Sequence, residues 1–101
     1  MKLTPIEHER FSLLAVTFQA LGDASRVRIV WNLARQELSV GRLAALTSMS
    51  QPAVSHHLRV LRQLRLVRVR RQGRESYYAL DDQHINRILN EGMRHVEDFM
   101  S

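Results

Sequence analysis

The chain has 101 residues, no cysteine and a formal net charge of +5. This length predicts one domain, residues 1–101, with a modest core of the kind that a partner subunit often completes. The lack of cysteine excludes disulfides and thiolate metal sites, so only histidine and the carboxylates remain as strong metal ligands. No apolar run approaches the roughly 20 residues of a membrane span, and no signal-peptide pattern opens the chain. We therefore expect a cytoplasmic protein with no membrane partner.

The charges are segregated along the chain. Residues 1–37 carry five basic and four acidic side chains, whereas residues 38–74 carry eight arginines and no acid. From Glu75 onward the balance reverses, with six acids against two arginines. Because a solvated surface usually mixes its signs, the acid-free span indicates an anionic polymer as its partner.

Capping residues and helical spacing predict four helices in the first two thirds of the chain. Thr4-Pro5-Ile6-Glu7 has the form of a capping box with proline at the first helical position. Asp23 or Ser25 begins the second helix, and Ser39 and Ser50 can cap the third and fourth. The four apolar stripes comprise, in turn, Phe11, Leu14, Phe18 and Leu21; Val27, Val30, Trp31 and Ala34; Val40, Leu43, Ala44 and Leu46; and Val54, Leu58, Leu61 and Leu64.

A different periodicity follows these helices. Residues 67–70 alternate apolar with charged side chains, residues 72–74 supply a turn, and residues 78–80 end a second β-prone run, which together predict a β-hairpin. Asp81 or Asp82 then offers a cap for a last helix, whose apolar positions are Ile85, Ile88, Leu89, Val96 and Phe99. The predicted fold class is therefore mainly α with a β-hairpin wing, in the order α-α-α-α-β-β-α.

Two short helices joined by a tight turn and followed by a basic hairpin indicate a winged helix-turn-helix that binds double-stranded DNA. The predicted recognition helix begins at Ser50, and small or planar polar groups near its start suit a major groove. The candidate base-facing residues are Ser50, Gln51, Ala53, Ser55 and His56, and the candidate phosphate contacts are Arg59, Arg62, Arg70, Arg71 and Arg74. The plainer alternative is a surface helix followed by a solvated hairpin.

Three segments, "LGDASRVRIVWNLARQELSVGRLA", "SQPAVSHHLRVLRQLRLVRVRRQGRESYYAL" and "DDQH", together resemble the ArsR/SmtB family of metal-responsive winged-helix repressors. The resemblance extends over nearly the full length. It implies a homodimer, built mainly from the first and last helices, that binds an operator with partial two-fold symmetry. It also implies that metal binding releases the DNA.

The same resemblance selects one metal site among those of the family. The thiolate sensors have a cysteine where "ELSV" places Ser39, and a second version of that site uses an acid where this chain has Arg42. The site of the zinc and cobalt sensors, on the last helix, matches Asp82, His84, His95 and Asp98. Family members have His or Glu at the last of these positions, so Asp98 is a departure. The implied ligand is Zn²⁺, with Co²⁺ or Ni²⁺ as alternatives.

Helix geometry supports this match independently. His84 and His95 are 11 positions apart, which is three turns plus roughly 20°, so both lie on one face of the last helix. One helix cannot close the site, because 11 residues rise about 16 Å whereas a zinc ligand lies about 2 Å from the ion. Two antiparallel copies would bring His84 of one chain beside His95 and Asp98 of the other. We expect His8 to be a solvated residue, and an additional metal ligand is the alternative.

Two other functions are alternatives to a metal-responsive repressor. The aspartates can serve as helix caps and His95 can favour the helix dipole, so the last helix could be a dimer contact in a repressor that responds to another signal or to none. An enzyme is disfavoured, because the sequence has no Gly-rich phosphate loop, no cysteine nucleophile and no His-Glu-x-x-His helix.

Overall fold

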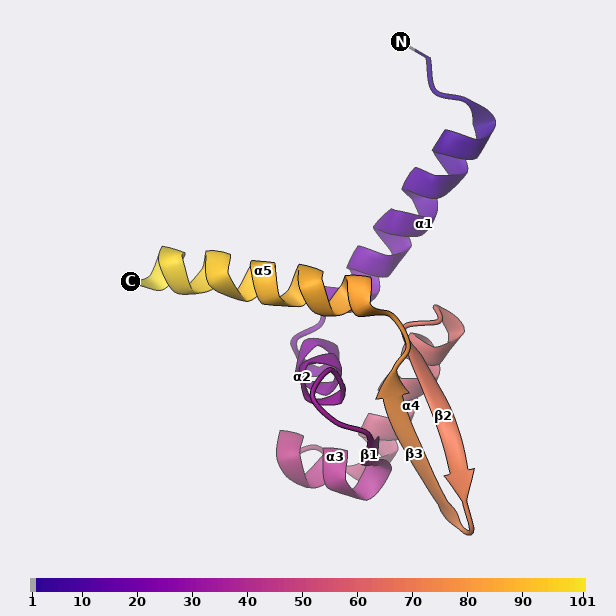
Figure 1. Cartoon of the computed structure of the whole chain (residues 1–101), viewed down its shortest axis with the longest axis vertical. Helices are drawn as coiled ribbons and strands as arrows, with labels where there is room; N and C mark the ends of the chain where they lie inside the picture. Colours follow the sequence, from indigo (N-terminus) through magenta and orange to yellow (C-terminus); the bar gives the residue numbers. More distant parts are fainter. Residues whose placement is uncertain (1) are drawn as a thin grey trace.

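The computed structural model describes residues 2–101 as a winged helix-turn-helix, which confirms the predicted fold class (Figure 1). The elements are α1 (Pro5–Leu21), α2 (Ala24–Leu33), β1 (Leu38–Ser39), α3 (Val40–Thr47), α4 (Gln51–Gln63), β2 (Val67–Gln72), β3 (Glu75–Leu80) and α5 (Gln83–Met100). None of the helices in residues 2–101 combines the length and apolarity that crossing a bilayer requires.

Side-chain caps fix where the helices begin. Thr4 and Glu7 form the predicted capping box of α1, and the Asp23 carboxylate accepts from the amides of Ser25 and Arg26 at the start of α2. The hydroxyls of Ser39 and Ser50 cap α3 and α4. At α5 the cap is Asp82, whose carboxylate accepts from the amide of His84, so the structure decides between the two aspartates. These local hydrogen bonds explain why the sequence located the helix starts.

The sheet has one strand more than the sequence predicted. β1 pairs antiparallel with β3, so the strand order is β1-β3-β2, and β2 and β3 form the predicted hairpin. A strand of two residues shows no alternation, which is why it was missed. Leu38 of β1 is buried opposite Tyr78, and this pairing attaches the middle of β3 to the end of the α2–β1 connection.

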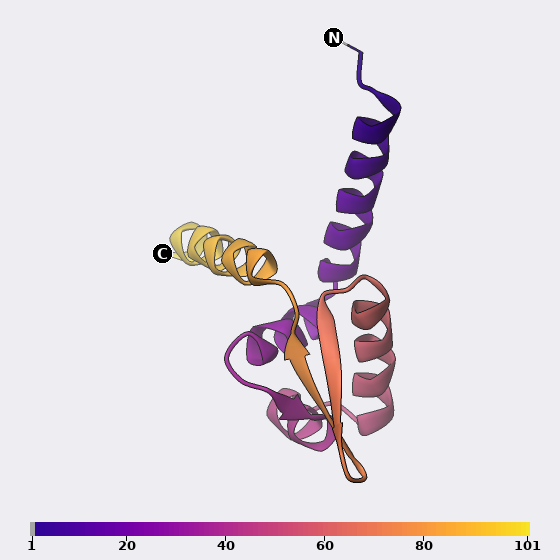
Figure 2. The same cartoon turned by 45° about the vertical axis from the view of Figure 1, so that its right-hand side comes forward.

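The core lies among α2, α3, α4 and the sheet. Its fully buried side chains are Ile29, Val30, Leu43, Val54, Leu58, Leu61 and Val67. By contrast, α1 and α5 project from this body in different directions (Figures 1 and 2). α1 contributes only Ala20 and Leu21 to the buried set and α5 only Ile85.

Most apolar side chains of α1 and α5 are therefore exposed. The exposed large hydrophobic residues within α1 and α5 are Ile6, Phe11, Leu13, Leu14, Val16, Phe18, Ile88, Val96, Phe99 and Met100. We call this set the terminal-helix face. In residues 2–101 the exposed large hydrophobics outside these two helices are Leu3 and Leu46. Apolar side chains are thus left without cover mainly on the two helices that the body does not bury.

Candidate DNA interface and metal centre

The helix-turn-helix is formed by α3, a tight turn and α4. Ser48 ends α3 in the left-handed conformation, with φ of 58°, and the chain then turns into the Ser50 cap of α4. The buried side chains of α4 are Val54, Leu58 and Leu61, which lie on one side of the helix. The exposed side chains of α4 include four that are predicted to contact DNA, namely Gln51, Ser55, His56 and Arg59, whereas Ala53 is half-buried.

The wing extends beside the start of α4. Gln51 and Ser55 of α4, Arg74 and Ser76 of the wing, and the chain around Ser39 line one polar hollow of about 440 Å³. This hollow joins the start of the recognition helix to the tip of the wing. Arg71 stands opposite Ser76 in the hairpin and is exposed. Of the residues predicted for DNA binding, Gln51, Ser55 and Arg74 therefore lie together around this hollow.

Arg70 has a different environment from the other wing arginines. Its guanidinium donates to both carboxylate oxygens of Glu37, with Nε to Oε1 at 3.2 Å and to Oε2 at 3.3 Å. These hydrogen bonds hold the pKa of the Glu37 carboxyl below its ordinary value. The prediction of Arg70 as a phosphate contact did not include this pair, because the two residues are 33 positions apart in the sequence.

The two adjacent histidines of α4 face different surroundings. His56 is exposed, whereas Nδ1 of half-buried His57 accepts from Nε of Arg26 at 3.1 Å. Arg26 belongs to α2, so this bond ties the recognition helix to the helix that supports it. Spacing within α4 gave no signal for the bond, because its partner is 31 residues away.

The four predicted metal ligands lie at the two ends of α5. His84, His95 and Asp98 are exposed, and Asp82 is half-buried as the helix cap. Within residues 2–101 of one chain, no group of three or more His, Asp or Glu side chains comes together closely enough to hold a metal ion. A site that uses all four residues therefore requires a second chain.

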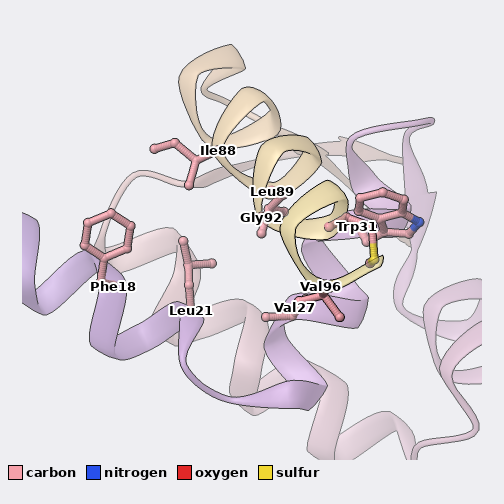
Figure 3. A pocket seen from close by; sticks show the side chains of 9 residues that line it. Phe18, Leu21, Val27, Trp31, Ile88, Leu89, Gly92 and Val96 are labelled. Atoms are coloured by element: carbon pink, nitrogen blue, oxygen red, sulfur yellow. The ribbon is translucent and has the colours of Figure 1, made fainter. Parts of the chain in front are cut away.

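An apolar hollow of about 330 Å³ lies beneath the middle of α5 (Figure 3). Its walls come from three helices: Phe18 and Leu21 of α1, Val27 and Trp31 of α2, and Ile88, Leu89, Gly92, Met93 and Val96 of α5. The guanidinium of Arg35 stacks on Trp31 at 3.6 Å from the ring centroid. In a single chain, α5 is thus supported mainly at its N-terminal end, where Ile85 is buried.

Hydrogen bonds join that end of α5 to the end of the recognition helix. The amide of Asp81 donates to the carbonyl of Leu66 at 2.9 Å, and Arg68 donates to the carbonyl of Leu80 at 2.9 Å. Leu66 in turn donates to the carbonyl of Leu61 within α4. Asp82, a predicted metal ligand, therefore follows a residue that is bonded directly to the α4–β2 connection.

Comparison with known proteins identifies the family. Residues 23–69 match the model described as bacterial regulatory protein, arsR family. The chain is 48% identical over 85 residues to the transcriptional repressor SmtB homolog of Synechocystis, with 84% of this chain and 64% of that protein covered. It is 35% identical over 89 residues to the cadmium resistance transcriptional regulatory protein CadC homolog of Staphylococcus aureus, with 87% of this chain and 74% of that protein covered.

Among solved structures, a homodimeric winged helix-turn-helix DNA-binding domain from Mycobacterium bovis superposes with a TM-score of 0.87. The aligned region covers 97% of this chain and 91% of that one, at 23% identity, so it supports the fold. The sequence relatives, the family match and the winged helix-turn-helix fold agree. The chain belongs to the arsR family of bacterial regulatory proteins.

Proposed function

We propose that this chain is a metal-responsive transcriptional repressor that binds operator DNA as a homodimer in the cytoplasm and releases it when Zn²⁺ binds between the two α5 helices. The observation that carries the proposal is the pairing, on one protruding helix, of an uncovered apolar surface with metal-ligating side chains at both ends. The relative named for cadmium resistance supports the response to a metal ion, and the homodimeric structural neighbour supports the dimer.

The terminal-helix face is the proposed dimer surface. Phe11 and Phe18 of α1 are 55% and 48% exposed, and Val96 and Phe99 of α5 are 45% and 83% exposed. A monomer that left all of these side chains in water would forgo about 25 cal/mol for each Å² of apolar surface it could bury. A second copy of the chain, related by a two-fold axis, offers the same surface in return.

The residues at the ends of α5 fit a Zn²⁺ site shared by two chains. Within residues 2–101, the imidazoles of His84 and His95 and the carboxylate of Asp98 make no hydrogen bond. The Asp82 carboxylate accepts one amide as helix cap and has lone pairs left for a further partner. Two imidazoles and two carboxylates match the nitrogen and oxygen ligands and the four-coordination that zinc prefers. When bound, the ion would cross-link the two α5 helices.

On the DNA side, two kinds of contact are proposed. Ser50, Gln51, Ser55 and His56 occupy the exposed start of α4, where short polar groups can reach base edges in a major groove. Arg59, Arg71 and Arg74 are exposed and supply phosphate contacts, which give affinity but no sequence information.

The two sites are linked through the dimer. A metal ion that favours one arrangement of the α5 helices disfavours any DNA-bound arrangement that differs from it, and the reverse holds by necessity. The bond from Asp81 to Leu66 gives this linkage a short path, because a shift at the start of α5 acts directly on the end of α4. A coupling of about 3 kcal/mol would weaken operator binding roughly a hundredfold.

The test is a metal titration of the apo-protein read by DNA affinity. A DNA duplex selected by the apo-protein from a random pool serves as the operator. We expect Zn²⁺ to lower the affinity for this duplex at least tenfold, and the quadruple variant Asp82→Ala, His84→Ala, His95→Ala, Asp98→Ala to bind it regardless of Zn²⁺. Operator affinity that is unchanged at saturating Zn²⁺ would contradict the metal response. The alternative function would then remain, namely a repressor of this family in which α5 is only a dimer contact.

A further inference from the structure

Arg70 is held more firmly than any other arginine of the wing. Its Nε and Nη2 both donate to Glu37, and its Nη1 donates to Gln72 at 2.9 Å. The guanidinium carbon also lies 4.9 Å from the centroid of the Tyr77 ring. A bidentate guanidinium–carboxylate pair has a fixed geometry that a single contact lacks, because two parallel N–H groups meet two oxygens. Most of the donors of Arg70 are thus engaged within the protein.

The two faces of the hairpin place Arg70 away from the polar hollow. Side chains alternate between the faces of a strand, and the register pairs Arg70 with Tyr77 and Arg71 with Ser76. Ser76 lines the polar hollow together with Gln51 and Ser55 of the recognition helix. Arg71 therefore shares the face that meets the recognition helix, and Arg70 stands on the opposite face.

Glu37 connects the wing to the body of the protein. It lies in the connection between α2 and β1, immediately before Leu38, and it is the last acid before the acid-free span of residues 38–74. The backbone pairs of β1 with β3 hold the middle of β3, at Tyr77 and Tyr78. The Glu37–Arg70 pair adds a link from the same connection to β2, the strand that has no backbone pairing with β1.

We propose that Glu37 and Arg70 form a strut that fixes the direction of the wing relative to the recognition helix, and that Arg70 does not contact DNA phosphate. Arg70 is then a positioning residue, and Glu37 matters for DNA binding although it is an acid. The inference rests on the proposed binding of operator DNA by α4 and the wing.

The first experiment compares Arg70→Gln with Arg71→Gln by the salt dependence of operator binding. Each lost phosphate contact reduces the slope of log K against log salt by about 0.9. We expect Arg71→Gln to show that reduction and Arg70→Gln to keep the wild-type slope while operator affinity falls about two- to fivefold, the range of an exposed ion pair. A slope reduced in Arg70→Gln as much as in Arg71→Gln would overturn the inference.

The second experiment uses Glu37→Gln and the double variant. If the strut acts as one unit, Glu37→Gln weakens operator binding about as much as Arg70→Gln, and the double variant is no worse than either single variant. If Arg70 instead contacts phosphate, removing the acid strengthens binding, which is the opposite sign. A wild-type protein with no affinity for any selected duplex would refute the proposed function itself, and so is distinct from both outcomes.

A third measurement needs no DNA. Amide hydrogen exchange in β2 and β3 of the apo-protein should become faster in Glu37→Gln, because the strut no longer restrains the hairpin. The matched control is Glu75→Gln, which removes an acid from the same hairpin that has no ion-pair partner among residues 2–101. Equal exchange in both variants and in the wild type would show that the pair does not restrain the wing.

Discussion

Replacing Phe11 with alanine should dissociate the dimer while leaving each chain folded. Phe11 is 55% exposed in the single chain, so it contributes little to the core and much to the terminal-helix face. Of a phenylalanine surface of about 200 Å², roughly 110 Å² is then available for burial by a partner, worth about 2 to 3 kcal/mol at 25 cal/mol per Å². A symmetric dimer loses this contribution twice, about 4 to 6 kcal/mol, which raises the dissociation constant about a thousandfold or more.

Sedimentation equilibrium over a dilution series measures this dissociation, and circular dichroism shows whether the helices remain. Leu46→Ala is the matched control, because Leu46 is 44% exposed but lies on α3, away from α1 and α5. We expect that variant to dimerise like the wild type. A dissociation constant for Phe11→Ala within a few-fold of the wild-type value would refute the assignment of α1 to the interface.

Three further predictions concern stability and recognition. Arg65 closes α4 in the left-handed conformation with φ of 59°, so Arg65→Gly should raise the free energy of unfolding by up to about 1 kcal/mol in chemical denaturation; a decrease would argue against backbone strain there. The amide of Arg26 lowers the pKa of the Asp23 carboxyl, so the stabilisation that the ionised carboxylate gives to the fold is present above the unfolded-state pKa and is lost as the pH falls through the lower folded-state pKa. Asp23→Asn keeps a capping oxygen but does not titrate, so the free energy of unfolding of this variant should fall less at acid pH. An unchanged loss of stability at acid pH would assign that loss to other groups. Gln51→Ala and Ser55→Ala should weaken operator binding by roughly 1–3 kcal/mol more than binding to random DNA, and equal losses on both duplexes would make them phosphate contacts.

The sequence predicted those features that depend on neighbours along the chain. Thr4, Ser39 and Ser50 each accept an amide three residues later, so a polar residue before an apolar helical stripe was sufficient to locate the helix starts. The hairpin was visible for the same reason, since alternation and the turn at Gly73, with φ of 61°, are both local.

Features that depend on residues distant in the sequence were not predictable in this way. β1 exists because Leu38 and Ser39 meet Tyr78 and Tyr77, about 40 positions away, and two residues carry no pattern of their own. The partners of Arg70 and His57 lie 33 and 31 residues away, so the charge pattern that predicted Arg70 as a phosphate contact gave no sign of its pair with Glu37. The proposed metal site was harder still to predict, because in the proposed arrangement each chain supplies only half of the ligands of each site.

The most direct test of the account is therefore a mixed dimer of His84→Ala and His95→Ala chains. Homodimers of either variant should lose both tight Zn²⁺ sites, since every site then lacks one imidazole. In the heterodimer, isolated with two different affinity tags, one site lacks both imidazoles, whereas the other joins the intact His84 of one chain to the intact His95 of its partner. We predict one tightly bound Zn²⁺ per heterodimer by equilibrium titration, and none in either homodimer; a heterodimer that binds no Zn²⁺, or homodimers that bind it like the wild type, would contradict a site shared between antiparallel α5 helices.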